Sequence, residues 1–281
     1  MTFRLPIRRA MSSLQQLPLI TKSSLILVDF DQTITKHDTI ASLGQFGVAQ
    51  SHNQKPWSYF VDSYLNDYRT HRNQLDHLPN DYTFNDFVQR LNTYKPIEKA
   101  SLVRVSKHKV FQGLTKQAIK EKAIELSHTE LQSNVISTLK PYKEQVRIVS
   151  LNWSKDWILG FLNQLGLERE QVYCNDLTFM SDICTGDIIP QILTTGDKQQ
   201  LINESIRANH EVIYIGDSLG DIEPLAKSNI GIVIGNDLSL IKTLSDFGYT
   251  VQEDTSKSSH LYHVDNWHQI KTILDRYYHT I

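Results

Sequence analysis

The stretch Leu25-Ile-Leu-Val-Asp29-Phe-Asp31-Gln-Thr33-Ile-Thr35 decides how this chain folds. Its apolar start predicts a central strand of a parallel sheet, because such strands are buried on both faces. Side chains alternate along a strand, so Asp29 and Asp31 should point to one side at its carboxyl end, where open α/β sheets bind ligands. Two carboxylates this close repel unless a cation lies between them or one is protonated. For this stretch alone, the alternative is an ordinary strand followed by a solvated turn.

A second apolar strand ends in the same way. The run Val212–Ile215 leads into Gly216-Asp217, and Asp221 follows after another glycine. Glycine lets the backbone turn sharply and approach a ligand. A lone Gly-Asp-Ser is a common turn, but two apolar strands that each end in an aspartate pair are much rarer by chance. We therefore expect Asp217 and Asp221 to face the same crevice as Asp29.

Two polar features lie between these strands in the sequence. A short predicted strand over Val146–Asn152 ends in the small polar side chains of Ser150 and Asn152, and Lys198 begins a predicted helix over 198–207. Taken alone, Ser150 fits a turn or a helix N-cap, and Lys198 fits a solvated surface lysine. Taken in order, an aspartate pair, a serine, a lysine and a second aspartate pair supply what phosphoryl transfer needs. Phosphoryl transfer needs a nucleophile, a general acid, donors to phosphate oxygens and carboxylates for Mg²⁺.

These segments resemble the haloacid dehalogenase superfamily of phosphatases. Asp29-Phe-Asp31-Gln-Thr33 matches its first motif, Ser150 its second, Lys198 its third, and Gly216-Asp217-Ser-Leu-Gly-Asp221 its fourth. The resemblance implies an α/β fold with a doubly wound, Rossmann-like parallel-sheet core. The large insert between the first and second motifs resembles the helical cap of phosphoserine-phosphatase-like members.

The same resemblance implies a role for each motif residue on a small phosphate ester. Asp29 attacks phosphorus and becomes an aspartyl phosphate, while Asp31 protonates the leaving oxygen and later deprotonates the attacking water. Ser150 and Lys198 bind the phosphoryl oxygens, with Asn152 beside them. The implied ligands of Mg²⁺ are all aspartates: Asp29, Asp31 through its backbone carbonyl, Asp217 and, in support, Asp221.

A finer resemblance concerns the substrate. The segments 150–158, 216–222, 230–233 and 261–267 resemble the phosphatase half of eukaryotic enzymes that dephosphorylate thiamine monophosphate, as do Trp57, Tyr64 and Tyr68 in the insert. We therefore expect a role in thiamine metabolism, with Tyr64, Tyr68 and Trp153 stacking on an aromatic, nitrogen-containing leaving group. An aromatic stripe at helical spacing is otherwise core packing, and this alternative stays open.

Two further functions stay open on the sequence alone. A non-catalytic binding or regulatory module on the same fold is expected to lose Asp29 or Asp31, and both are present. A phosphotransferase that passes the phosphoryl group to an alcohol acceptor would need the same residues as a hydrolase.

The chain divides into three predicted parts. Residues 23–36 and 135–281 alternate between strand and helix patterns and are expected to form the core. Residues 37–134 contain four or five helical patterns, among them Trp57–Tyr68 and Phe84–Leu91, and predict an all-helical cap. Residues 1–22 are basic and precede the first acidic residue, Asp29, which fits either a mitochondrial presequence or a disordered lead.

Composition excludes several classes of protein. The 29 basic and 31 acidic residues give no field that would attract nucleic acid or an anionic membrane surface. Cys174 and Cys184 are the only cysteines, which argues against a disulfide scaffold and favours a reducing compartment, cytoplasmic or mitochondrial. No stretch has the length of a transmembrane helix. The oligomeric state cannot be derived from these features.

Overall fold

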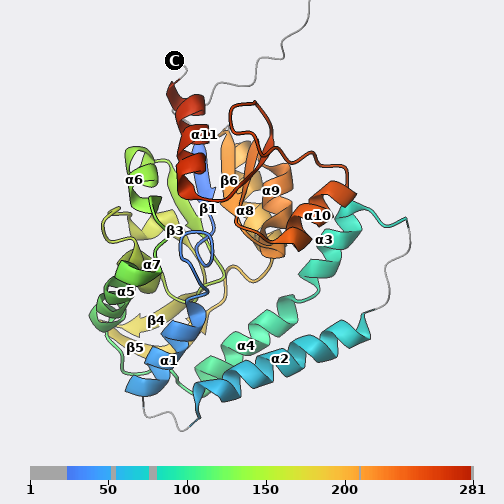
Figure 1. The fold of residues 1–281 in the computed structure, drawn as a ribbon. Helices are drawn as coiled ribbons and strands as arrows, with labels where there is room; N and C mark the ends of the chain where they lie inside the picture. Colours follow the sequence, from blue (N-terminus) through green and yellow to red (C-terminus); the bar gives the residue numbers. More distant parts are fainter. Residues whose placement is uncertain (1–23, 52–54, 76–80, 209, 280–281) are drawn as a thin grey trace, which may run out of the picture.

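A six-stranded parallel sheet forms the centre of the molecule in the computed structural model, which describes residues 24–51, 55–75, 81–208 and 210–279 (Figure 1). The predicted basic lead, residues 1–22, lies outside these ranges. The strand order is β3-β2-β1-β6-β7-β8. The strands are β1 (Leu25–Val28), β2 (Val146–Val149), β3 (Val172–Tyr173), β6 (Val212–Gly216), β7 (Ile230–Ile234) and β8 (Leu261–Val264). The predicted doubly wound α/β core is confirmed.

Helices cover both faces of the sheet because successive side chains of a strand point to opposite faces. Ile26 and Val28 belong to one hydrophobic core and Leu27 to another, and each is at most 2% exposed. The first core includes residues of α5 (Lys116–Glu130), α6 (Val135–Leu139), α7 (Lys155–Phe161) and α11 (Trp267–His279). The second includes residues of α8 (Thr195–Arg207), α9 (Ile222–Lys227) and α10 (Leu238–Asp246).

The winding of the sheet reverses between β1 and β6. From β1 the chain continues to β2 and β3 on one side, and it later enters β6, β7 and β8 on the other. β1 and β6 are direct neighbours, with Leu25 opposite Val212 and Val28 opposite Ile215. Open α/β sheets bind ligands beside the carboxyl ends of the strands at such a reversal. The residues that follow β1 and β6 therefore lie where a ligand is expected.

Helices also fill the stretch between β1 and β2 in the sequence. They are α1 (Ile40–Gln50), α2 (Trp57–Gln74), α3 (Phe84–Asn92), α4 (Lys95–Lys107), α5 and α6. The long helix α2 packs along α4 beyond the carboxyl edge of the sheet (Figure 1). Gly44 lets α1 approach α2 closely, since a Cβ at this position would lie 2.2 Å from the Trp57 ring. The helical patterns expected within residues 37–134 are thus helices, while the limits of the cap as a domain stay a prediction.

A β-hairpin joins the later half of the chain to these helices. β4 (Asp176–Met180) and β5 (Ile183–Ile189) are antiparallel. The amide of Cys184 donates to the carbonyl of Leu114 at 2.8 Å, and the amide of Ile188 donates to Ser106 Oγ at 3.0 Å. The hairpin lies within residues 135–281, which were predicted to form the core domain, but its strands pack against the helical insert. Within the described residues, no helix is both long and apolar enough to cross a membrane.

Candidate active site

The aspartates of the first motif follow β1 at the reversal of the sheet. Asp29 is 6% exposed, and its amide donates to the carbonyl of Ile215 in β6 at 2.9 Å. The chain then turns tightly, because the amides of Ile34 and Thr35 both donate to the carbonyl of Phe30. Gln32 adopts a φ of 62°, which is uncommon for a residue other than glycine. As a result, Asp29 and Asp31 both line the same cavity.

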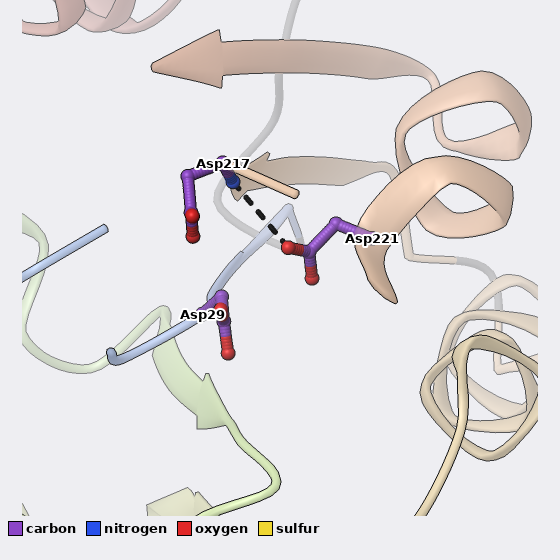
Figure 2. Close-up of side chains that lie close together, drawn as sticks. All are labelled: Asp29, Asp217 and Asp221. Carbon is purple, nitrogen blue, oxygen red and sulfur yellow. Dashed lines mark hydrogen bonds between the residues drawn. The ribbon is translucent and has the colours of Figure 1, made fainter. Parts of the chain in front are cut away.

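Three carboxylates from the ends of β1 and β6 converge, as Figure 2 shows. Asp29, Asp217 and Asp221 each offer an oxygen, and these oxygens lie within 4.8 Å of one another. Asp221 is fully buried and accepts hydrogen bonds from the Tyr214 hydroxyl at 2.6 Å and the Asp217 amide at 3.3 Å. Thr33 donates from its hydroxyl to Asp217 Oδ1 at 2.7 Å. The two aspartate pairs predicted to meet thus contribute three of their four carboxylates to one cluster.

Lys198 lies beside this cluster. It is only 2% exposed, and its Nζ lies 2.9 Å from Asp29 Oδ1 and 2.7 Å from Asp221 Oδ1. The start of α8 is fixed by a capping box between Thr194 and Asp197, which holds Lys198 in place one residue later. The alternative of a solvated surface lysine is therefore wrong. One ammonium faces three carboxylates, so the cluster keeps an excess of negative charge.

Burial and this excess of negative charge shift the pKa values of the carboxylates and of Lys198. Burial raises the pKa of Asp29 well above its ordinary value; Asp221 raises it further, while Lys198 lowers it. Burial and then Asp221 raise the pKa of Asp217 to about 7. Burial lowers the pKa of Lys198, but Asp221 and Asp29 raise it overall, so the amine stays charged. An all-carboxylate donor set with excess negative charge fits Mg²⁺, which prefers oxygen ligands.

Asp31 has different surroundings from Asp29. Its Oδ1 accepts hydrogen bonds from the amide and the hydroxyl of Thr39 at 2.7 and 2.6 Å, and its Oδ2 accepts one from Asn152 Nδ2 at 3.0 Å. Burial and then the carboxylate of Asp38 raise its pKa to about 6, although these hydrogen bonds lower it. A carboxyl with this pKa can exchange a proton near neutral pH. The carboxylate of Asp31 is not part of the triad, which leaves only its backbone carbonyl for the predicted metal contact.

Asn152 has a different environment from the predicted one. It is fully buried; its Nδ2 donates to Asp31 and to Thr39 Oγ1, and its Oδ1 accepts from the Trp153 amide at 2.7 Å. The expected contact of Asn152 with phosphate is therefore corrected, because its amide is committed to positioning Asp31. Ser150 does line the cavity, and its Oγ accepts from the Asn152 amide at 3.0 Å. A hydroxyl that accepts one hydrogen bond keeps its proton for another acceptor.

A cavity of about 490 Å³ extends from these residues to the inserted helices. One end contains Asp29, Asp31, Ser150, Lys198 and Asp217. The aromatic part of the lining is largely apolar, includes one acidic residue, and consists of Trp57, Phe60, Val61, Tyr64, Leu65, Glu98 and Trp153. The Trp57 ring meets the Trp153 ring edge-on, with centroids 6.0 Å apart. Trp153 and Ser150 thus line the same cavity, and the expected contact of Trp153 with the leaving group stays a proposal.

Tyr64 and Tyr68, which were expected to act together, differ in their surroundings. Tyr64 lines the cavity, and its hydroxyl donates to Glu98 Oε1 at 2.7 Å. Tyr68 is 37% exposed and stacks on Tyr94 with ring centroids 4.6 Å apart. Tyr68 is not among the described residues that line the cavity. The expected stacking of Tyr68 on a substrate is thus corrected, while the expectation for Tyr64 stands as a proposal.

Three residues of the site were not identified from the sequence. Thr39 precedes α1 and holds Asp31, Tyr214 lies within a strand and holds Asp221, and Glu98 lies on α4. Of the three, only Tyr214 carried a signal, because a tyrosine in the middle of a buried strand must find a partner for its hydroxyl. Thr39 and Glu98 belong to the site only because the chain folds back on itself.

Comparison with known proteins agrees with this fold. No family model matches the chain. Cold tolerance protein 1 of Saccharomyces cerevisiae is 26% identical over 250 residues, which cover 76% of this chain and 79% of that protein. The mitochondrial bifunctional TH2 protein of Arabidopsis thaliana is 26% identical over 178 residues, which cover 59% of this chain and 29% of that protein. The solved structure of cytosolic 5'-nucleotidase IIIB bound to cytidine matches with a TM-score of 0.51 and 17% identity, covering 92% of this chain and 87% of that chain.

The four motif residues lie around one cavity as well as following the motif order along the chain. Asp29, Ser150, Lys198 and Asp217 come from four separate segments and line one cavity at the reversal of the sheet. Their order along the chain is that of the four motifs noted in the sequence, and the fold is shared with the solved relative. The chain thus shares its fold with this solved structure, and the order and placement of these residues agree with the haloacid dehalogenase motifs noted in the sequence.

Proposed function

We propose that this protein is a Mg²⁺-dependent phosphomonoester hydrolase that forms an aspartyl phosphate on Asp29. The observation that supports this proposal most strongly is the composition of one end of the cavity. There Asp29 lies beside Lys198 within a triad of carboxylates, and Ser150 and Asp31, whose pKa is raised, line the same cavity. One cavity thus contains groups that can serve as nucleophile, general acid and donors to phosphate oxygens.

In the first step, a carboxylate oxygen of Asp29 bonds to phosphorus, and the bond from phosphorus to the leaving oxygen breaks. Asp31 gives its proton to that oxygen, so the leaving group departs as an alcohol. The hydroxyl of Ser150 and the ammonium of Lys198 donate hydrogen bonds to the phosphoryl oxygens. When bound by Asp29, Asp217 and Asp221, Mg²⁺ supplies positive charge that offsets the phosphate and the carboxylates.

In the second step, Asp31 removes a proton from a water molecule, which attacks the phosphorus of the aspartyl phosphate. The bond between phosphorus and Asp29 breaks, inorganic phosphate leaves, and both aspartates return to their initial state. Thr39 and Asn152 hold the carboxylate of Asp31 through both steps and are therefore positioning residues.

For the substrate, we propose an ester whose leaving group is aromatic and contains nitrogen, with thiamine monophosphate as the leading candidate. The wall formed by Trp57, Tyr64 and Trp153 supports this choice, because aromatic rings stack well on flat heterocycles. The resemblance to thiamine monophosphate phosphatases in the sequence and the similarity to the TH2 protein support it further. The mitochondrial relative is compatible with either expected compartment, cytoplasm or mitochondrion.

A screen of phosphate esters with Mg²⁺ tests this proposal. It should include thiamine monophosphate, pyridoxal phosphate, phosphoserine and sugar phosphates, with an alcohol acceptor added in parallel reactions. We expect thiamine monophosphate to be hydrolysed most efficiently, with activity lost in EDTA and restored by Mg²⁺. Asp217→Asn should raise the Mg²⁺ concentration needed for activity, whereas Asp265→Asn, at an exposed position before α11, should not.

Each part of the proposal has its own contrary outcome. Activity that survives exhaustive chelation would argue against the metal, and a preference for sugar phosphates would argue against the aromatic leaving group. Efficient transfer to the alcohol acceptor would make the protein a phosphotransferase. The absence of turnover on every ester would leave a binding module.

A further inference from the structure

The aromatic part of the cavity lining contains a carboxylate that the proposed chemistry does not use. Glu98, on α4, lines the cavity and accepts a hydrogen bond from the Tyr64 hydroxyl at 2.7 Å. Tyrosine is a neutral donor, so it satisfies the oxygen without balancing the charge. Within the described part of the chain, no lysine, arginine or histidine forms an ion pair with Glu98. Burial raises the pKa of Glu98, which is the expected result for a carboxylate without a cationic partner.

The remaining charged groups of the cavity do not supply that partner. Among the described residues that line it, Lys198 is the only basic one, and its ammonium is bound to Asp29 and Asp221. Asp38 contributes a second carboxylate to the lining, and this carboxylate accepts a hydrogen bond from the Ile40 amide at 2.8 Å. The part of the cavity that would receive the leaving group is therefore acidic.

The aromatic residues of the same wall favour the same kind of ligand. Trp57 and Phe60 stack with ring centroids 5.6 Å apart, and Trp57 meets Trp153 edge-on. The face of an aromatic ring attracts a cation, most strongly where water is excluded. An acidic group and aromatic rings around one cavity are complementary to a flat cation. With Mg²⁺ bound at the carboxylate triad, phosphate would bind beside Lys198, whereas the residues around Glu98 favour a cation.

We infer that Glu98 is a specificity-determining residue, which selects phosphate esters whose leaving group carries a positive charge on or beside a flat ring. This selectivity deepens the proposed function and rests on it, since Glu98 acts on the leaving group of the ester hydrolysed at Asp29. A purely structural role as acceptor for Tyr64 is the competing explanation. Glutamine keeps the acceptor oxygen and removes the charge, so Glu98→Gln separates the two roles.

The test uses two synthetic esters of nearly identical shape, an N-methylpyridinium ethyl phosphate and the corresponding tolyl ethyl phosphate, which differ in the charge of the ring. The kcat/KM of each ester is measured with Mg²⁺ for the wild type, for Glu98→Gln and for Glu121→Gln. Glu121 is a matched control, because it is an exposed glutamate on α5 whose partner is Gln117. We expect the wild type to prefer the cationic ester by about tenfold or more, a preference that Glu98→Gln loses and Glu121→Gln keeps.

A ratio of kcat/KM values that is the same in the wild type and in Glu98→Gln would overturn the inference and leave the hydrolase proposal standing. If the wild type hydrolysed neither ester and also failed to hydrolyse acetyl phosphate, the inference and the hydrolase proposal would both be overturned. If the Glu98→Gln protein does not fold, a binding measurement on the wild type tests the inference instead. In calorimetric titration of the wild type, the cationic product alcohol should bind at least about tenfold more tightly than the neutral one. Equal affinities would contradict the role given to Glu98.

Discussion

Asp29 and Asp31 are two residues apart in the sequence, yet their carboxylates have different partners. Asp29 shares the ammonium of Lys198 with a second carboxylate, whereas Asp31 is held by the neutral donors of Thr39 and Asn152. The carboxylate of Asp29 therefore lies among charged groups, whereas that of Asp31 has a pKa raised to about 6. Different environments of this kind let two carboxyl groups of one site act as nucleophile and as acid.

Thr39→Val tests the positioning of Asp31. Valine keeps the shape of threonine but removes the hydroxyl that donates to Asp31 and accepts from Asn152 and the Trp157 indole. We expect kcat for an alkyl phosphate to fall by about tenfold or more, because its leaving oxygen needs the proton of Asp31. Acetyl phosphate has a leaving group that needs no proton, so its first step, measured as the burst of acetate release, should slow much less, while hydrolysis of the aspartyl phosphate slows for both esters.

The matched control is Thr138→Val, at a buried threonine of α6 that is not among the described residues lining the cavity. It should change neither rate. A burst of leaving-group release that slows equally for both esters in Thr39→Val would indicate general damage to the site and would contradict a specific role in proton transfer. A melting curve of each variant shows whether the fold is intact.

Single residues also show how far the sequence alone could lead. Asp29, Asp217 and Lys198 could be predicted because the strand ends and the helix start that carry them are local features of the sequence. The sequence predicts that Asn152 contacts phosphate, but its side chain donates to Asp31 and Thr39, which are 121 and 113 residues away in the sequence. A side chain amide fits a phosphate and a carboxyl group equally well, and local pattern cannot distinguish the two.

At the level of elements, α2 presents only part of its predicted aromatic face to the cavity. Trp57, Phe60 and Tyr64 line it, whereas Tyr68, one turn further along, packs on Tyr94. Helical spacing predicted a common face correctly, but it could not show where along the helix the cavity ends. That limit depends on how α2 crosses α4 and on the turn between α3 and α4, which are contacts between distant segments.

This division of α2 predicts different effects for two similar substitutions. Tyr64→Ala should raise KM for an aromatic phosphate ester by about tenfold, since it removes a ring and the hydroxyl that holds Glu98. Tyr68→Ala, the matched control on the same helix, should change KM by less than about twofold. The measurement is steady-state kinetics with thiamine monophosphate or the best ester of the screen. A larger effect of Tyr68→Ala than of Tyr64→Ala would show that the cavity, as described, is not the substrate site.

The hairpin β4–β5 shows the corresponding limit for strands. Its short alternating runs predict a hairpin, and the structure contains one. Its place against α4 and the turn before α5 depends on pairings such as Thr115 with Ile183, between segments far apart in the sequence. By contrast, the long apolar runs of β1, β6 and β7 predict buried parallel strands without any knowledge of their neighbours.

For the molecule as a whole, the acidic wall of the cavity should lower stability. Burial raises the pKa of Glu98 in the folded protein above the ordinary value of 4.5. The folded state therefore binds this proton more readily than the unfolded chain does. The resulting stabilisation is complete below pH 4.5 and is lost as the pH rises through the folded-state pKa. At neutral pH the charged carboxylate thus costs stability, a cost that functional sites often carry.

Glu98→Gln should therefore melt at a higher temperature than the wild type at neutral pH. The difference should shrink as the pH falls below the folded-state pKa of Glu98, because the glutamate then becomes neutral like glutamine. Thermal unfolding followed by circular dichroism over a pH series measures this difference, with Glu121→Gln as the control. A Glu98→Gln protein that is less stable than the wild type at neutral pH would mean that the carboxylate has a cationic partner.

The most direct test of the whole account is to identify the residue that carries the phosphoryl group during turnover. The experiment uses Asp31→Asn with Mg²⁺ and acetyl phosphate, whose leaving group needs no proton, so that the second step is slowed more than the first. The reaction is quenched in acid, and the peptides are analysed by mass spectrometry. We predict one added phosphoryl group on Asp29, removed by hydroxylamine as an acyl phosphate should be, and absent from Asp29→Asn. A phosphoryl group on another residue, or an Asp29→Asn protein that releases phosphate at nearly the wild-type rate, would contradict this mechanism.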